Sequence, residues 1–325
     1  MDKIKIGIIG AGYIGGVHAG VLAGDERVRL ASVYDVDAER AAALARSSGA
    51  RPASSAEELI ETCDAVYITT PNTQHTSLAI AAAGAGKHVF CEKPMATTLT
   101  DARSVLKAAQ EGSGVFQVGH NRRFAPVYVK LKELIAGERR PHSAHVKMNR
   151  GELLNPAWVG DAKITGGFLY ETTIHMFDMM RFQFGEVAEL YALGSTHEYA
   201  ETDDFSVLLR FASGMHATLC SSADASWLYP FESIEVFAHH ATIVTREMES
   251  ITYSTGLEGD HATHSMHQLS KEEKWGYLQE DRAFVESIVT GTQATVTALD
   301  GCTAVALVDA CYRSVRTGER IELKG

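Results

Sequence analysis

The stretch "GIIGAGYIGG", residues 7–16, decides the fold of the N-terminal half of this 325-residue chain. It continues the apolar run "KIKIGIIG", which has strand character, and it opens a helix-like segment. Its Gly10, Gly12 and Gly15 therefore stand in the context that a dinucleotide-binding G-x-G-x-x-G turn requires. Gly10 permits the tight turn, Gly12 lets the backbone approach a pyrophosphate, and Gly15 lets helix and strand pack closely. The N-terminus of the helix would then face the phosphates.

An acidic residue, Asp35, ends the second predicted strand, "VRLASVYD". A carboxylate at this place accepts hydrogen bonds from the ribose hydroxyls and repels a 2′-phosphate. The next arginine along the chain is Arg40, so no arginine stands directly after the strand to hold such a phosphate. The pattern favours NAD over NADP. A cap on the following helix is the alternative role for Asp35, although Asp37 is better placed as that cap.

Strand and helix signals alternate through the rest of the first half. Alternation at this spacing indicates βαβ units and a parallel sheet. Strands are predicted at residues 64–71, 87–94 and 114–119, and helices at 38–48, 76–86 and 101–112. The segment "CEKPM" closes the second of these strands, and ligands of such folds bind at the carboxyl ends of strands. Lys93 stands at this end, where Pro94 keeps it out of the helical region.

The pattern changes after about residue 120. Several runs with strand character predict an antiparallel or mixed sheet, and hence an α+β second domain. These runs cover residues 187–195, 205–211, 215–222, 233–238 and 241–245, and helices are predicted at 127–137, 278–291 and 300–318. We therefore predict a dinucleotide-binding domain at 1–120 and a substrate-binding and oligomerisation domain at 121–325. An alternative is that the C-terminal helix packs back on the first domain.

A second informative stretch, "YETTIHMFD" at residues 170–178, carries three ionisable side chains in an apolar context. In an α-helix, Glu171, His175 and Asp178 would lie on one face. The flanking segments are apolar around the whole helix, which predicts burial. Buried charge is costly unless it is paired or used. A core polar cluster satisfied within the fold is one interpretation, and a functional site is the other.

The bulk properties exclude several classes of function. The formal net charge of −11 argues against a polyanion-binding surface, so nucleic acid is not an expected partner. The five scattered cysteines include no C-x-x-C pair, so neither a disulfide framework nor a thiolate zinc site is indicated. His261, His264 and His267 recur every three residues, but a polar loop explains them better than a metal site, and we predict no metal. The N-terminus does not resemble a signal peptide and no long apolar stretch occurs, so a cytoplasmic location without membrane attachment is expected.

Three further segments carry a family resemblance. The chain has "TTPNTQH" at residues 69–75, "GKHVFCEKP" at 86–94 and "GGFLYETTIH" at 166–175. With the glycine-rich turn, these segments resemble the Gfo/Idh/MocA oxidoreductase family, which includes glucose–fructose oxidoreductase and myo-inositol dehydrogenase. The resemblance covers nearly the whole chain. It implies an N-terminal Rossmann domain and a C-terminal α+β domain on an open, mostly antiparallel sheet that commonly forms dimers or tetramers.

The resemblance also implies roles for individual residues. Lys93 would lie beside the substrate and the nicotinamide, and His175 would be the acid/base. Glu171 stands where most members have aspartate, which puts direct transfer of substrate preference from those members in doubt; an equivalent replacement is the alternative. Residues that would contact the cofactor are Tyr13, Ile14, Thr70, Pro71, Asn72, His75, Glu92 and Lys93 itself. Arg123 and Trp158 fall in segments that often border the substrate pocket.

These assignments imply an NAD-dependent dehydrogenase of a sugar, inositol or related polyol. Lys93 and His175, from different domains, would meet at the interdomain cleft. His175 would take the hydroxyl proton while Lys93 stabilises the developing alkoxide. Asp178 would support the site from behind. Arg122 would pack at the hinge, and the alternative is that Arg122 and Arg123 hold a carboxylate or phosphate of the substrate. Alternatives within the family are a glycoside hydrolase that uses NAD transiently, enzymes of unrelated carbonyls or imines, and a non-catalytic NAD-sensing regulator.

Overall fold

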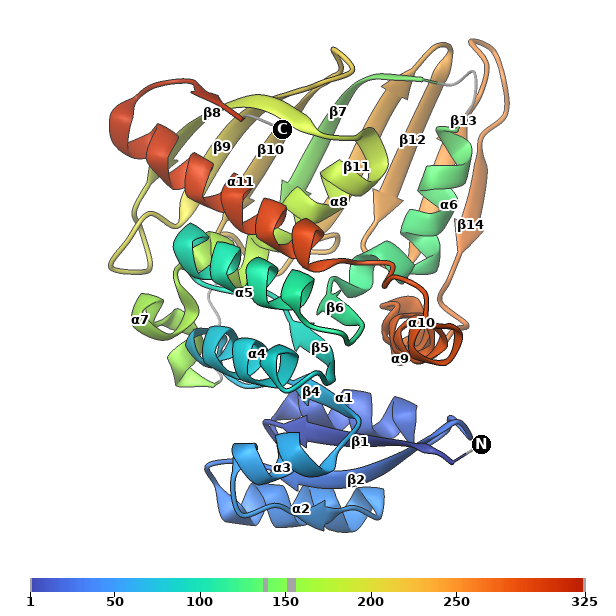
Figure 1. Ribbon diagram of the computed structural model, residues 1–325. Helices are drawn as coiled ribbons and strands as arrows, with labels where there is room; N and C mark the ends of the chain where they lie inside the picture. Colours follow the sequence, from blue (N-terminus) through green and yellow to red (C-terminus); the bar gives the residue numbers. More distant parts are fainter. Residues whose placement is uncertain (1, 137–139, 151–155, 324–325) are drawn as a thin grey trace. The chain divides into compact units, whose positions relative to one another are not determined.

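A parallel sheet with strand order β3-β2-β1-β4-β5-β6 forms the centre of the first of two units, which comprises Met1–Asn121 and Tyr277–Val305 (Figure 1). The computed structural model describes residues 2–136, 140–150 and 156–323. The strands are β1 (Ile4–Ile9), β2 (Val28–Tyr34), β3 (Arg51–Pro52), β4 (Ala65–Ile68), β5 (His88–Glu92) and β6 (Phe116–Gly119). This order, which starts from β1 and extends to both sides, is that of a Rossmann domain.

Helices pack on both faces of this sheet. They are α1 (Tyr13–Leu22), α2 (Ala38–Ser48), α3 (Ala56–Thr62), α4 (His75–Gly84), α5 (Leu99–Glu111) and α10 (Tyr277–Thr290). Successive side chains of a strand point to opposite faces. On one face, Ile6 and Ile8 belong to a buried cluster with residues of α1 and α10, among them Phe284. On the other face, Gly7 leaves room for Leu59 of α3, because a Cβ added at Gly7 would lie 2.4 Å from its side chain.

The second unit comprises Arg122–Gly276 and Ala306–Gly325 and is built on a mostly antiparallel sheet of order β14-β13-β12-β11-β7-β10-β9-β8-β15. Within it, β7 and β10 run parallel. The strands are β7 (Pro141–Met148), β8 (Val187–Ser195), β9 (Asp204–Phe211), β10 (His216–Ser222), β11 (Glu232–Ala238), β12 (Ala241–Arg246), β13 (Ser250–Ser254), β14 (Ala262–Ser265) and β15 (Ile321–Glu322).

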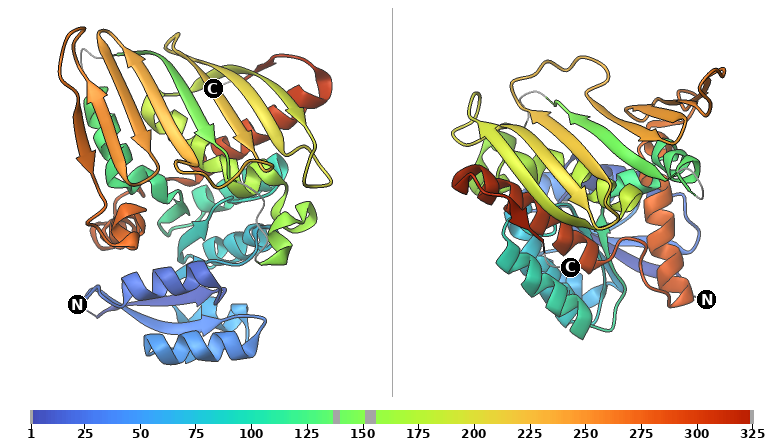
Figure 2. Two further views of the ribbon diagram at one scale, coloured as in Figure 1. Left: turned by 180° about the vertical axis from the view of Figure 1, so that it is seen from behind. Right: turned by 90° about the horizontal axis from the view of Figure 1, so that it is seen from above.

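One face of the second sheet is covered by helices and the other lies open (Figure 2). The helices on the covered face are α6 (Pro126–Leu134), α8 (Ile174–Phe184) and α11 (Ala298–Thr317), and the unit also contains the short helices α7 (Ala162–Thr165) and α9 (Lys271–Lys274). Residues of β9 alternate between buried and exposed, with Leu209 buried and Leu208 exposed. On the covered side, Ser314 of α11 accepts a hydrogen bond from the Ala192 amide of β8 at 2.9 Å. This alternation is typical of a sheet with one face in the core.

The predicted fold class, a Rossmann domain followed by an α+β domain on an open, mostly antiparallel sheet, is confirmed. Strand β7 was not predicted from the sequence, and residue 137, at the end of the predicted helix 127–137, lies outside the described residues. Helix α11 begins in the first unit and ends in the second. In the part of the chain that the structure describes, no helix is long and apolar enough to cross a membrane.

Candidate active site

The glycine-rich turn between β1 and α1 has the geometry that its motif predicts. Gly10 adopts a φ of 103°, and a Cβ added there would lie 2.6 Å from the Thr69 backbone. A Cβ at Gly15 would lie 2.1 Å from the Gly10 carbonyl oxygen. A Cβ at Gly12 would meet no described atom within 4 Å, so the space above this residue is open. A pyrophosphate needs such a cradle at a helix N-terminus, and the turn therefore fits a dinucleotide.

The carboxylate of Asp35 lies against this turn. Its Oδ2 accepts a hydrogen bond from the Ala11 amide at 2.7 Å, and its Oδ1 accepts one from the Asp37 amide at 2.8 Å. Asp37 caps α2 by accepting from the amides of Glu39 and Arg40. Asp35 is therefore not the cap of α2, and its position after β2 fits the ribose-binding role predicted for it.

The segment after β4 connects the glycine-rich turn to the end of β5. The Thr69 hydroxyl donates to the carbonyl oxygens of Ile9 and Gly10 at 3.1 and 2.7 Å. Asn72 is buried, and His75, which opens α4, is 1% exposed. The His75 ring nitrogens lie 2.8 Å from the Pro94 and Thr70 carbonyl oxygens. Burial lowers the pKa of His75.

The end of β5 carries a buried ion cluster that the sequence did not indicate. Glu92 ends the strand and Lys93 follows in a bend. His18 of α1 lies between two carboxylates: its Nδ1 is 2.8 Å from Asp281 and its Nε2 is 3.2 Å from Glu92. Burial lowers the pKa of His18, but the two carboxylates outweigh it, so the pKa lies well above its usual range. The only local signal for His18 is its place three residues after Gly15 on the buried side of α1.

In the second unit, the helix that carries Glu171 and His175 begins irregularly. Leu169–Thr173 form a π-helical turn that continues into α8. The prediction of a regular α-helix is therefore wrong in its first turn, because this turn has the wider hydrogen-bonded repeat of a π-helix. His175 and Asp178 are 6% and 1% exposed, whereas Glu171 is half-buried, so the predicted burial of the helix is confirmed.

Two residues distant in sequence hold the start of this helix. The Glu201 Oε1 accepts a hydrogen bond from the Phe168 amide at 3.2 Å, and the Tyr312 hydroxyl accepts one from the Leu169 amide at 3.2 Å. Gly167 adopts a φ of 121°, and a Cβ there would lie 2.6 Å from the Tyr312 hydroxyl. These contacts satisfy amides that every helix start leaves without intrahelical partners. They also explain why glycine stands at position 167.

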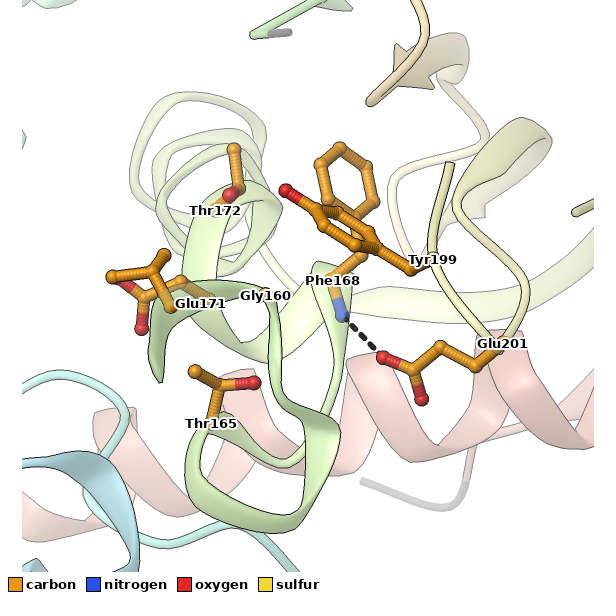
Figure 3. A pocket seen from close by; sticks show the side chains of 8 residues that line it. Gly160, Thr165, Phe168, Glu171, Thr172, Tyr199 and Glu201 are labelled. Carbon is orange, nitrogen blue, oxygen red and sulfur yellow. Dashed lines mark hydrogen bonds between the residues drawn. The ribbon is translucent and has the colours of Figure 1, made fainter. Parts of the chain in front are cut away.

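A small recess lies beside Glu171 (Figure 3). Its lining comprises Val159, Gly160, Thr165, Phe168, Glu171, Thr172, Tyr199 and Glu201. Asp203 shapes the loop that supplies Tyr199 and Glu201, because its carboxylate accepts hydrogen bonds from the amides of His197, Glu198 and Tyr199. Burial and, secondarily, Asp203 raise the pKa of Glu201. The sequence analysis did not identify Tyr199 or Glu201, because an acidic loop has no distinctive pattern.

The other predicted substrate residues lie in the same unit. The Arg123 Nε donates to Asp178 at 2.8 Å, and the Arg122 Nη2 donates to Glu232 at 2.6 Å. Both guanidinium groups are therefore engaged by carboxylates, and contact of Arg123 with substrate stays a prediction. Trp158 is half-buried in the short 3₁₀ helix Ala157–Gly160.

The remaining histidines form no metal centre in the described structure. His264 lies on β14 rather than in a loop, and its ring stacks on Tyr253 with centroids 5.7 Å apart. His239 and His240 stack on each other at the turn between β11 and β12. Among residues 2–136, 140–150 and 156–323, no group of three or more histidine, cysteine or acidic side chains is arranged to hold a metal ion.

A Rossmann unit with an open glycine-rich turn fits a dinucleotide cofactor, and the second unit contains a buried histidine, a residue type suited to acid/base catalysis. The chain belongs to the Gfo/Idh/MocA oxidoreductase family: residues 4–120 match its NAD-binding Rossmann fold and residues 132–323 its C-terminal α/β domain. It is 30% identical to myo-inositol 2-dehydrogenase of Thermotoga maritima over 99% of each chain. It is also 30% identical to inositol 2-dehydrogenase of Rhizobium meliloti, over 98% of this chain and 99% of that protein. The solved structure of GenD2 from gentamicin A biosynthesis, in complex with NAD, is 25% identical and superposes with a TM-score of 0.87 over 100% of this chain and 97% of that chain.

Proposed function

We propose that this protein oxidises a secondary alcohol of an uncharged sugar, inositol or related polyol with NAD, reversibly. The observation that carries the proposal is the recess beside Glu171, in the unit that also holds the buried His175. The two similar inositol 2-dehydrogenases, which match this chain over nearly their full length, support the substrate class.

The lining of the recess favours neutral hydroxyl groups. Its polar side chains are two carboxylates, two threonine hydroxyls and one tyrosine hydroxyl, and the described lining contains no lysine or arginine. Carboxylates accept hydrogen bonds from hydroxyls but repel phosphates and other carboxylates. Arg122 and Arg123, the two arginines considered from the sequence as anion contacts, are already bound to Glu232 and Asp178. A sugar phosphate or a uronate would therefore find less support here than a neutral polyol.

The size of the recess is consistent with part of a ligand. Its volume is about 10 Å³, close to the room that a single water molecule or hydroxyl group needs, whereas sites that bury whole small molecules span roughly 300–1,000 Å³. We infer that one hydroxyl group of the polyol enters it. Glu171 lines the recess and is partly exposed, so it orients the ring by accepting hydroxyl hydrogen bonds.

The chemistry divides between residues of the two units. NAD, held by the turn at Gly10–Gly15 and by Asp35, supplies the hydride acceptor. His175 takes the proton from the substrate hydroxyl oxygen, and the Lys93 ammonium donates a hydrogen bond to that oxygen as negative charge develops on it. The Arg123–Asp178 pair supports α8 one turn beyond His175 and keeps the imidazole in place.

The test is NADH formation by the purified protein across neutral inositols, aldoses and anhydro-sugars, with uronates and sugar phosphates alongside. Turnover of a stereochemical subset of the neutral polyols, with NAD preferred over NADP, is the expected result. Turnover of charged sugars alone would overturn the assignment of the recess. NAD binding without any alcohol turnover would favour the regulator, and glycoside cleavage without net NADH would favour the redox-cycling hydrolase.

A further inference from the structure

Two buried histidines of the first unit, His18 and His75, flank the segment Glu92–Pro94. Neither takes part in the proton transfer described above, although the family resemblance implies a cofactor contact for His75. They are 0% and 1% exposed. Burying a polar ring is costly unless both nitrogens find partners. In both cases the partners include the strand end that carries Lys93.

His18 holds the residue before Lys93. Its Nδ1 lies 2.8 and 3.0 Å from the two carboxylate oxygens of Asp281, and its Nε2 lies 3.2 Å from the Glu92 Oε1. Ionised carboxylates only accept hydrogen bonds, so both ring nitrogens must carry protons to satisfy this geometry. The rings of Tyr67, Phe90 and Tyr277 surround the imidazole. A low local dielectric strengthens such charge-assisted bonds.

Glu92 transmits this contact to Lys93. Its second oxygen, Oε2, accepts a hydrogen bond from the Lys93 amide at 3.1 Å. Asp281, His18, Glu92 and the Lys93 backbone therefore form one continuous chain of hydrogen bonds. Asp281 belongs to α10, so a residue far along the sequence fixes the backbone at the end of β5.

His75 holds the residue after Lys93. Its Nδ1 lies 2.8 Å from the Pro94 carbonyl oxygen, and its Nε2 lies 2.8 Å from the Thr70 carbonyl oxygen. The ring thus links the turn after β4 to the turn after β5. Carbonyl oxygens only accept, so a neutral ring donates to one of them and a protonated ring to both. The charged groups that act on this ring are Glu92 and Lys93.

We propose that His18 and His75 are positioning residues that clamp Lys93 from its two sides, through Glu92 and through Pro94. The inference rests on the proposed role of Lys93 in stabilising the alkoxide. A displacement of about 1 Å at a reacting group costs on the order of 10²-fold in rate. A lysine held at its own amide and at the following carbonyl keeps its Cα fixed while the long side chain reaches the substrate.

The test is a double-mutant cycle with Lys93. The single variants are His18→Gln, His75→Gln and Lys93→Ala, and both histidine changes are repeated in the Lys93→Ala protein. His88→Gln is the matched control, because His88 lies half-buried at the other end of β5. For each protein we would measure kcat and KM for the polyol, the Kd for NADH by fluorescence, and thermal unfolding.

We expect each clamp variant to lower kcat by about 10- to 100-fold, with KM for the polyol within about threefold of wild type. His18→Gln should also keep the Kd for NADH within about threefold, and kcat of His75→Gln is measured at saturating NAD because His75 is predicted to contact the cofactor. In the Lys93→Ala background the same changes should lower kcat by less than about twofold, because residues that act through one group are not additive. His88→Gln should retain the wild-type kcat.

Two other results separate the failures. If Lys93→Ala itself retains near-wild-type kcat, the role of Lys93 in the proposed function is wrong. If Lys93→Ala is impaired but the histidine variants keep wild-type kcat, or lower it equally in both backgrounds, the clamp is wrong. If His18→Gln does not fold, Asp281→Asn replaces it in the experiment. Asparagine keeps the shape of the Asp281 side chain and removes one charge from the same chain of hydrogen bonds.

Discussion

In the first unit, Glu92 and Lys93 come directly after a buried strand of a regular parallel sheet, whereas in the second unit Glu171 and His175 lie across the junction of a π-helical turn with α8. The parallel sheet places the carboxyl ends of all its strands at one edge, so its topology alone brings together the turns that follow β1, β4 and β5. The second unit has no such rule, and Glu201 and Tyr312 fix the helix start instead.

The two units are sensitive to substitution for different structural reasons. A strand end of the first unit is held in place by a sheet that is buried on both faces. The helix start of the second unit is held by a few contacts from residues distant in sequence. We therefore expect substitutions near the start of α8 to displace Glu171 and His175 readily. Substitutions at the strand ends of the first unit should weaken cofactor binding and leave the sheet intact.

The largest effect on activity is expected at His175, the proposed acid/base. His175→Ala should lower kcat for the polyol by about 10²–10⁴-fold, the usual contribution of a well-placed general base. The Kd for NADH, measured by fluorescence, should change little. His145→Ala is the control, since His145 is exposed on β7 of the same unit. Near-normal turnover of His175→Ala would remove the acid/base role from this residue.

Gly167→Ala should disturb the contacts of Tyr312 and Glu201 with the start of the helix. In Gly167→Ala the Cβ would lie 2.6 Å from the Tyr312 hydroxyl and 3.0 Å from the Glu201 carboxylate. The positive φ costs about 1–3 kcal/mol in stability, and the displaced helix start should lower kcat further, by about tenfold or more.

Gly185→Ala separates these two costs. Gly185 also has a positive φ, 92°, but a Cβ there would meet no described atom within 4 Å. It should lose stability by a similar amount while keeping kcat, as measured by thermal unfolding and steady-state kinetics. Equal kcat in the two variants would show that the contacts of Glu201 and Tyr312 do not govern the geometry of Glu171 and His175.

Most of the fold follows from local sequence patterns. The glycine turn, Asp35 and the alternation of strands and helices sufficed for the Rossmann unit, because each signal lies within one βαβ unit. Asp37 as a helix cap was equally local. An antiparallel or mixed sheet was predictable from the runs with strand character, of which β9 is one. That this sheet is open was implied by the family resemblance.

The parts that were not predictable depend on long-range contacts. Gly167 belongs to a segment that carries the family resemblance, but only the structure shows that Tyr312 and Glu201 crowd it. The π-helical turn has no distinctive composition, so the sequence predicted a regular α-helix at this place. Nothing near His18 in the sequence distinguishes it from an ordinary helix residue, because its partner Asp281 lies 263 residues further along the chain.

In the first unit, two neighbouring glycines offer a sharper test of cofactor binding. Gly12 and Gly16 both have open space where a Cβ would lie. Gly12→Ala places a methyl group where the pyrophosphate approaches and should weaken NAD binding by about tenfold, or ~1.4 kcal/mol, without lowering the melting temperature. Gly16→Ala, inside α1, should gain up to about 1 kcal/mol of stability and bind NAD normally. Isothermal titration with NAD would decide, and equal affinities would argue against the proposed approach of phosphate to Gly12.

The smallest effect concerns the charge of the helix anchor. Burial and Asp203 raise the pKa of Glu201 above its ordinary value of 4.5, so the folded protein binds this proton more tightly than the unfolded chain. Its contribution to stability is therefore largest below pH 4.5 and falls as the pH rises through the raised pKa of the folded state. Glu201→Gln keeps an oxygen that accepts from the Phe168 amide but cannot titrate.

We accordingly expect Glu201→Gln to gain stability relative to wild type as the pH rises from about 4 to about 8, with kcat nearly unchanged. Melting temperatures across this range, with the exposed Glu258→Gln as control, measure the difference. If the difference in melting temperature between Glu201→Gln and wild type stays constant with pH, the pKa of Glu201 is the same in the folded and unfolded chains. A fall in kcat would mean instead that the charge itself, and not only the acceptor oxygen, serves the recess beside Glu171.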